Sequence, residues 1–123
     1  MQLRVSLALF AAGLLSACGD DAASSTHHIA GASADRGKAL IARLGCGSCH
    51  EIPGIANADG LVGPSLQRFG ARIYIAGMLR NTPTNLVIWL RDPQAVVPGN
   101  VMPNLDLDRD TASDVAEYLL QLR

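Results

Sequence analysis

The sequence predicts an all-α domain of three or four short helices joined by long ordered loops. Three segments combine helical spacing of apolar residues with capping residues, and the segments 57–70 and 92–105 are rich in Gly, Pro and Asn. Neither of those segments shows the apolar–polar alternation of a strand, so no sheet is expected. Loops of this length need something central to organise them, and a bound prosthetic group would do so.

The first helix is expected at residues 34–44. Ser33 or Asp35 can cap its N-terminus, and Gly45 follows its end. Gly37 lies inside this helix, where a glycine costs about 1 kcal/mol relative to alanine. We therefore expect another element to approach closely at Gly37.

The second and last helices are bounded by proline and aspartate. The second begins at Thr82-Pro83, a capping residue followed by proline, and stops before Asp92-Pro93. Its apolar residues are Leu86, Trp89 and Leu90. The last helix is expected at residues 109–122 with Asp108 as N-cap, and its apolar face comprises Ala112, Val115, Tyr118, Leu119 and Leu122. We expect the first and last helices to cross.

Composition indicates one globular domain. The chain has 123 residues, of which 49% are hydrophobic and 17% charged, as in folded rather than disordered proteins. Its formal charge of −1 lacks the basic excess that binding to nucleic acid requires. Nucleic acid is therefore not expected as a partner.

Residues 1–17 have the features of an export signal. Arg4 precedes an apolar run at residues 5–15, which is too short to span a bilayer comfortably. The run leads into Leu15-Ser16-Ala17-Cys18, which is similar to the bacterial lipobox and implies that Cys18 becomes the lipidated first residue. An ordinary signal peptide with an incidental cysteine is the alternative. We expect an exported protein, periplasmic or otherwise extracytoplasmic, that is lipid-anchored to a membrane.

Residues 18–33 are small and polar and show no apolar period, so we expect a flexible tether ahead of a domain at 34–123. His27 and His28 lie in this tether. They could bind a metal ion, but no other cluster of ligands accompanies them. Exposed linker histidines are therefore expected.

Covalent attachment of haem is indicated by Cys46-Gly47-Ser48-Cys49-His50, the C-x-x-C-H pattern. In this chemistry both thiols form thioethers with the haem vinyl groups, while the adjacent imidazole reaches the iron. A C-x-x-C pair alone is a weak signal, and the histidine directly after it makes the pattern specific. We expect one covalently attached haem c, with Cys46 and Cys49 as the thioether residues.

Two other kinds of site use the same residue types. A thioredoxin-like disulfide needs a strand–turn–helix context, whereas here a helix precedes the cysteines. A structural zinc ion needs four ligands, and beyond Cys46, Cys49 and His50 only the tether histidines and Cys18 remain. Both alternatives are less favoured than haem.

Methionine is the expected sixth ligand of the iron, since Met/His ligation suits c-type cytochromes. Beyond the export signal the chain has Met78 and Met102. Met102 lies in Pro98-Gly99-Asn100-Val101-Met102-Pro103, a stiff irregular segment that we call the Met102 strap (residues 98–103). Met78 lies in an apolar stretch, where filling core space is the ordinary role of a methionine. Met102 is therefore the preferred ligand.

With these residues in view, the chain resembles a class I, monohaem c-type cytochrome. More narrowly, it is similar to the cytochrome c domain of the bacterial cytochrome c oxidase subunit II that bears haem c. The resemblance covers about residues 35–123. Besides the haem motif it rests on Arg36-Gly37, Gly60-Leu61-Val62-Gly63-Pro64-Ser65-Leu66, Asn81-Thr82-Pro83, Arg91-Asp92-Pro93-Gln94, the Met102 strap and Tyr118-Leu119. It implies the class I cytochrome c fold, with three to five short helices and long loops wrapped around one haem.

The resemblance also implies roles for single residues. His50 would be the proximal iron ligand, the carbonyl of Pro64 would accept the other ring N–H of His50, and Met102 would be the distal ligand. Gly37 would pack against Tyr118 where the terminal helices cross. Trp89 and Arg72 would bind the haem propionates, although plain core packing is an equal alternative for Trp89. The resemblance does not extend to the copper-binding domain or membrane hairpin of the oxidase subunit, and we expect the lipid anchor to replace them.

These residues predict a one-electron carrier rather than an enzyme. If His50 and Met102 fill both axial positions, the iron has no open site for a substrate and can only cycle between Fe(III) and Fe(II). Expected partners are redox proteins of a respiratory chain, namely a terminal oxidase, a cytochrome bc complex or a dehydrogenase. Two alternatives need a labile sixth ligand: a peroxidase-like haem enzyme, and a sensor in which His27 or His28 replaces Met102. Arg68, Arg72, Arg80 and Arg91 either face an acidic partner or form a solvated surface.

Overall fold

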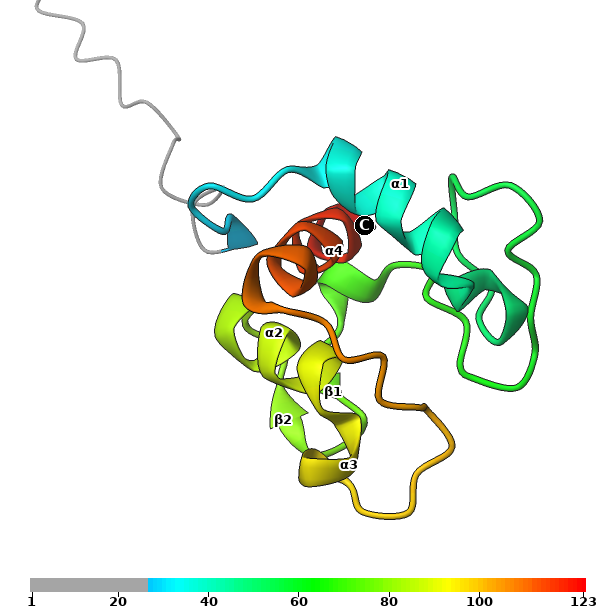
Figure 1. Cartoon of the computed structure of the whole chain (residues 1–123), viewed down its shortest axis with the longest axis vertical. Coiled ribbons are helices and arrows are strands. Elements are labelled where there is room, and N and C mark those ends of the chain that lie inside the picture. Colours follow the sequence, from blue (N-terminus) through cyan, green and yellow to red (C-terminus); the bar gives the residue numbers. More distant parts are fainter. Residues whose placement is uncertain (1–26) are drawn as a thin grey trace, which may run out of the picture.

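The computed structural model describes residues 27–123, so the expected signal peptide and Cys18 lie outside the described residues. Within them the chain forms α1 (Ala34–Leu44), α2 (Pro83–Arg91), α3 (Pro93–Val96) and α4 (Arg109–Gln121). Helix α4 lies at the centre, with α1 and α2 packed against it (Figure 1). The short helices and long loops expected from the sequence are present. No helix of the described residues is long and apolar enough to cross a membrane.

The predicted bounds and caps of α1 are confirmed. The Ser33 hydroxyl accepts a hydrogen bond from the backbone N–H of Arg36 at 3.3 Å, and Gly45 ends the helix with a φ of 74°. A φ in this left-handed region strains any residue with a Cβ, which explains glycine at this position.

The crossing of α1 and α4 depends on Gly37, as predicted. A methyl group at Gly37 would lie 1.9 Å from the backbone oxygen of Asp114 and 3.1 Å from Cβ of Tyr118. Only glycine allows the two helix backbones to approach this closely. The cost of a glycine in mid-helix is therefore offset by the packing that it permits.

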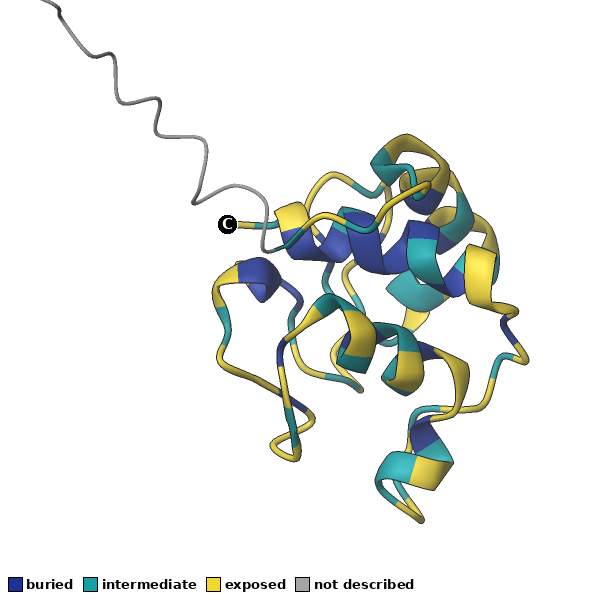
Figure 2. Ribbon diagram, turned by 90° about the vertical axis from the view of Figure 1, so that its left-hand side faces the viewer, coloured by how far each residue is buried: buried dark blue, intermediate teal, exposed yellow. Residues whose placement is uncertain are grey.

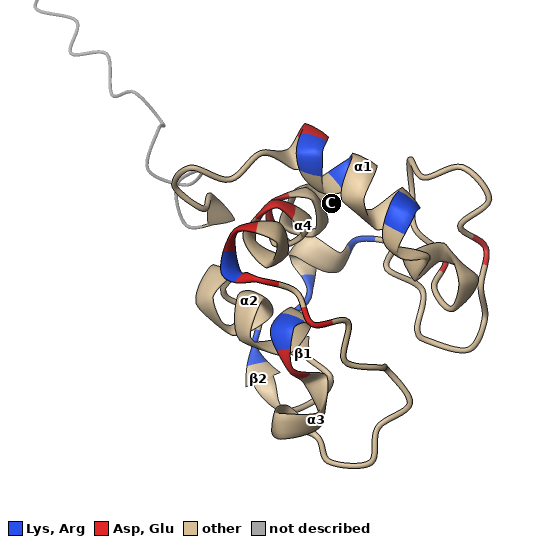
Figure 3. Ribbon diagram, in the orientation of Figure 1, with Lys and Arg blue, Asp and Glu red and all other residues tan. Residues whose placement is uncertain are grey.

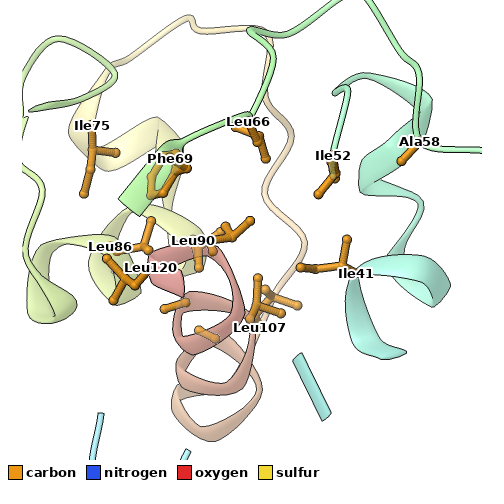
Figure 4. Close-up of a cluster of buried hydrophobic side chains, with 14 residues drawn as sticks. Ile41, Ile52, Ala58, Leu66, Phe69, Ile75, Leu86, Leu90, Leu107 and Leu120 are labelled. Atoms are coloured by element: carbon orange, nitrogen blue, oxygen red, sulfur yellow. The ribbon is translucent and has the colours of Figure 1, made fainter. Parts of the chain in front are cut away.

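The core surrounds α4 (Figures 2 and 4). Ile41 of α1 lies on one side of it, and Leu86 and Leu90 of α2 lie on the other. On α4 itself Ala116 and Leu120 are buried, whereas Tyr118 and Leu122, which the predicted apolar face included, are half-buried. The predicted Ala112, Val115 and Leu119 are buried, and the buried surface of α4 is wider than predicted because it also includes two carboxylates, Asp114 and Glu117.

A short hairpin and a short helix were not predicted. Strands β1 (Tyr74–Ile75) and β2 (Leu79–Arg80) pair antiparallel, with Ile75 opposite Leu79, although no sheet was expected. Strands of two residues are too short to show alternation. Helix α3 begins inside the predicted loop 92–105, because the Asp92 carboxylate accepts from the N–H of Ala95 at 3.0 Å and so caps a new helix.

The described end of the expected tether, residues 27–33, is hydrogen-bonded to α4. His28 Nδ1 lies 2.9 Å from a carboxylate oxygen of Glu117, and the N–H of Ile29 donates to the other oxygen at 2.7 Å. The N–H of Ser33 donates to Asp114 at 2.7 Å. These carboxylates are buried and require polar partners, and the segment before α1 provides them.

Candidate functional site

The cysteine–histidine motif forms one tight turn directly after α1. Residues Cys46–Ser48 form a single 3₁₀ turn, and the N–H groups of Cys49 and His50 donate to the carbonyl of Cys46 at 3.2 and 3.0 Å. Both cysteines are half-buried and are not bonded to each other. The turn therefore presents two free thiols and an imidazole within five residues.

The following loop folds back onto this turn. The N–H of Gly60 donates to the carbonyl of Gly47 at 3.0 Å, and the N–H of Gly63 donates to that of Cys49 at 2.8 Å. A methyl group at Gly60 would lie 2.5 Å from the backbone of Cys49. Glycine is therefore needed for the loop to lie flat against the motif.

The ring of His50 has a fixed orientation. Its Nδ1 lies 2.7 Å from the carbonyl oxygen of Pro64, as the resemblance implied. A carbonyl only accepts, so Nδ1 donates its hydrogen, and the neutral ring keeps its free lone pair on Nε2. Gly63 lies against the same ring, since a methyl group there would be 2.3 Å from Cε1. The ring is thus prepared to bind a metal through Nε2.

The Cys46 thiol differs from the reactive cysteine of a redox pair. Burial raises the pKa of the Cys46 thiol and favours its protonated form. Dithiol oxidoreductases depend on a cysteine whose pKa is lowered. Within residues 27–123 no group of three or more His, Cys, Asp or Glu side chains is arranged to hold a metal ion by itself.

The Met102 strap lies in the segment between α3 and α4. Met102 is half-buried and packs against the hydrophobic core. In Figure 1 the loop after the cysteine motif and the strap both extend to the right of the helical core. Met78, by contrast, is 65% exposed beside the turn between β1 and β2, so the core-filling role expected for it is wrong.

The two residues proposed to bind propionates have different surroundings. Trp89 is half-buried and packs against the core. The Arg72 guanidinium donates to the backbone carbonyls of Ser65 and Gln67 and lies over the ring of Phe69, 5.5 Å from its centroid. Arg72 therefore ties the loop after His50 to the following turn.

A family model confirms the class of protein. The model described as cytochrome c matches residues 34–123, which includes the cysteine–histidine turn and the Met102 strap. The chain belongs to the cytochrome c family. Membership implies electron transfer through haem, which this family typically attaches covalently.

Known relatives of this cytochrome c domain are parts of larger proteins. It is 36% identical over 91 residues to cytochrome c oxidase subunit 2 of Alkalihalophilus pseudofirmus, and 32% identical over 94 residues to cytochrome c oxidase subunit 2 of Bacillus subtilis. Each match covers 73% of this chain and 26% of the relative. The chain thus spans about a quarter of the length of these relatives.

The site of this cytochrome c domain fits a covalently attached haem. Two unpaired thiols, a histidine whose tautomer leaves Nε2 available, and glycines that bring the loop onto the motif are all present. Three apolar side chains are exposed and could be covered by a bound apolar group. They are Leu61 and Val62 in the loop after His50, and Val101 in the strap.

Sequence reasoning assigned no role to several residues of this site. The motif that contains Gly63 does not by itself indicate the contact with His50, and nothing in the sequence indicates that Gln94 and Asn100 hydrogen-bond the backbone of Met102. The close approach of Gly63 to the His50 ring is visible only in the structure. The two amides give no sequence signal, because their partners are backbone atoms.

Proposed function

We propose that this cytochrome c domain is a one-electron carrier with one haem c, whose iron is ligated by His50 and Met102. The main support for this proposal is the hydrogen bond from His50 Nδ1 to the Pro64 carbonyl. It places the ring hydrogen on Nδ1 and leaves the lone pair of Nε2 free to bind the iron. Cys46 and Cys49 would hold the haem through thioethers.

Each protein group has a distinct task in this proposal. Bound haem supplies a reversible Fe(III)/Fe(II) couple. The Pro64 carbonyl holds the proton on Nδ1 and so keeps His50 in the ligating tautomer. The half-buried Met102 thioether would be the second protein ligand of the iron and would exclude water and small ligands. His28, which the sensor alternative would use in place of Met102, is hydrogen-bonded to Glu117.

The ligand assignment is tested by absorption spectra of the haem-loaded protein, oxidised and reduced, before and after carbon monoxide is added. The wild type should be low-spin, should show the weak methionine-to-iron band, and should not bind carbon monoxide. Met102→Ala should lose that band and form a carbon monoxide adduct. Met78→Ala is the matched control and should resemble the wild type.

A carbon monoxide adduct in the wild type would contradict the electron-carrier proposal. It would mean that the sixth position is open or labile, as a peroxidase-like enzyme or a ligand-switching sensor requires. A band lost in Met78→Ala rather than in Met102→Ala would reassign the ligand.

Partner and location form a second part of the proposal. We infer that the domain delivers electrons in a respiratory chain to a terminal oxidase or a similar partner, because its relatives are oxidase subunits. We also infer export and a lipid anchor at Cys18, on the basis of the sequence of residues 1–18. Cys18→Ser should move the protein from the membrane fraction to the soluble extracytoplasmic fraction, and unchanged membrane retention would exclude this anchor.

A further inference from the structure

The Met102 strap begins with a tight turn. The N–H of Asn100 donates to the carbonyl of Val97 at 3.2 Å, and Pro98 and Gly99 are the two central residues. Gly99 has a φ of 79°, the left-handed value that a type II turn requires at its third position. The turn fixes the direction in which the chain leaves α3, but it does not by itself fix Met102.

Asn100 connects the turn, α3 and Met102. Its Nδ2 donates to the carbonyls of Pro93 and Val97 at 2.9 and 2.7 Å, and its Oδ1 accepts from the N–H of Met102 at 2.8 Å. The side-chain amide therefore uses both of its donor hydrogens and its acceptor within the protein.

Gln94 of α3 holds the strap through three further hydrogen bonds. Its Nε2 donates to the carbonyls of Asn100 and Met102, each at 3.0 Å, and its Oε1 accepts from the N–H of Gly99 at 3.0 Å. Gln94 and Asn100, which we call the amide clamp, thus hold both the N–H and the carbonyl of Met102.

Helix α3, which carries Gln94, is itself held in place. Pro93, the first residue of α3, is fully buried, and the Asp92 carboxylate caps the helix. All the hydrogen bonds of the clamp are made between protein atoms. The position of the Met102 backbone is therefore set by α3 before any bond from its sulfur to a metal forms.

We propose that Gln94 and Asn100 are positioning residues, which hold Met102 where it can remain bound to the haem iron. This inference rests on the proposed role of Met102 as distal ligand. Without the clamp the strap gains freedom, the methionine leaves the iron more often, and an added ligand competes more easily for that position.

The experiment measures imidazole affinity and the methionine-to-iron band of the oxidised, haem-loaded protein. Gln94→Leu removes three hydrogen bonds at similar volume, so imidazole should bind about tenfold tighter and the band should weaken. Met102→Ala has no methionine for imidazole to displace, so it gives the upper limit of imidazole affinity. Gln121→Leu on α4, whose amide binds Glu117 instead, is the matched control and should equal the wild type.

A second variant separates positioning from folding. Gln94→Glu keeps the acceptor for the Gly99 N–H but loses both donors to the strap, so it should resemble Gln94→Leu in imidazole affinity. Thermal unfolding of each variant shows whether a change in imidazole affinity merely reflects a loss of stability of the whole fold.

The outcomes distinguish the two proposals. Wild-type imidazole affinity and an unchanged band in folded Gln94→Leu or Gln94→Glu would overturn the positioning role, while Met102 remained the ligand. Equal imidazole affinity in the wild type and Met102→Ala would overturn both proposals, since Met102 would then not occupy the iron.

Discussion

The His50 ring lies flat against Gly63, and this contact depends on the absence of a side chain. A methyl group at Gly63 would lie 2.3 Å from Cε1, 2.6 Å from Nδ1 and 2.9 Å from Nε2 of the ring. The ring could not keep its place and its hydrogen bond to the Pro64 carbonyl at the same time. A single hydrogen atom at Gly63 therefore permits the ligating orientation.

Gly63→Ala should displace the imidazole and destabilise the haem-loaded protein by about 2 kcal/mol, as overpacking of a tight contact does. Chemical denaturation measures the loss, and the low-spin fraction of the haem spectrum reports the imidazole. Gly31→Ala is the control, because its methyl group would meet no atom within 4 Å and would change only local backbone strain at a φ of 79°. A Gly63→Ala spectrum equal to that of the wild type would show that the ring tolerates the extra methyl group.

The tight turn of the cysteine–histidine motif could be located from the sequence. Cys46, Cys49 and His50 are recognisable because their chemistry requires a fixed spacing. Gln94 and Asn100 could not be predicted, because their task is to bind backbone carbonyls and N–H groups whose positions depend on the folded strap. The resemblance implied a haem propionate as the partner of Arg72, and the structure adds that the Arg72 guanidinium binds two backbone carbonyls.

Among the elements, α4 holds the segment before α1 through two carboxylates three residues apart. The Arg36 guanidinium, together with the N–H of Ser33, lowers the pKa of Asp114. Burial acts to raise the pKa of Glu117, but hydrogen bonds from the Ile29 N–H and from His28 outweigh it and lower that pKa overall. Both groups thus favour the charged form when the segment is docked.

These lowered pKa values predict a loss of stability in acid. A carboxyl group with a depressed pKa stabilises the fold above its ordinary value, near pH 4, and loses that contribution as the pH falls through the lowered value. The unfolding free energy of Asp114→Asn should be lower by about 1 kcal/mol at neutral pH, a modest value because the Arg36 side chain is exposed to solvent. The difference from the wild type should shrink below about pH 4.

Denaturant titrations across this pH range measure the effect. Asp106→Asn, an exposed position with a φ of 51° that asparagine also tolerates, is the matched control. Parallel pH profiles for the wild type and Asp114→Asn would assign the acid sensitivity to other groups.

Element bounds that depend on local caps could be predicted, and those that depend on tertiary partners could not. Each predicted helix is capped by a residue visible in the sequence, namely Ser33, Thr82 or Asp108. Such caps are recognisable because the side chain accepts a hydrogen bond from an N–H only three residues further on. The docking of residues 28–33 escaped prediction because it depends on Asp114 and Glu117, more than 80 residues away. The hairpin of β1 and β2 is too short to carry a pattern.

Across the whole molecule, charge is unevenly distributed. Residues 60–91 contain Arg68, Arg72, Arg80 and Arg91 and no acidic residue, whereas the rest of the described chain has nine acidic and five basic residues. Acidic residues gather on α4 and on the segment leading into it (Figure 3). Three of the four arginines are exposed, and Arg72 is half-buried. The basic stretch begins in the loop after His50, and we expect an anionic partner that approaches its exposed arginines to meet positive potential despite the nearly neutral net charge.

Electron transfer to an anionic oxidant should therefore slow as salt is added. With hexacyanoferrate as the oxidant, the second-order rate should fall about threefold between roughly 10 and 200 mM ionic strength, because salt screens the attraction. Arg80→Gln should reduce both the rate at low salt and its salt dependence, whereas Arg123→Gln at the C-terminus should change neither. The formal net charge is negative, so if it governed the encounter, salt would instead accelerate the reaction. Stopped-flow measurement of the oxidation rate separates these cases, and an acceleration would show that the basic stretch does not face the route of electron transfer.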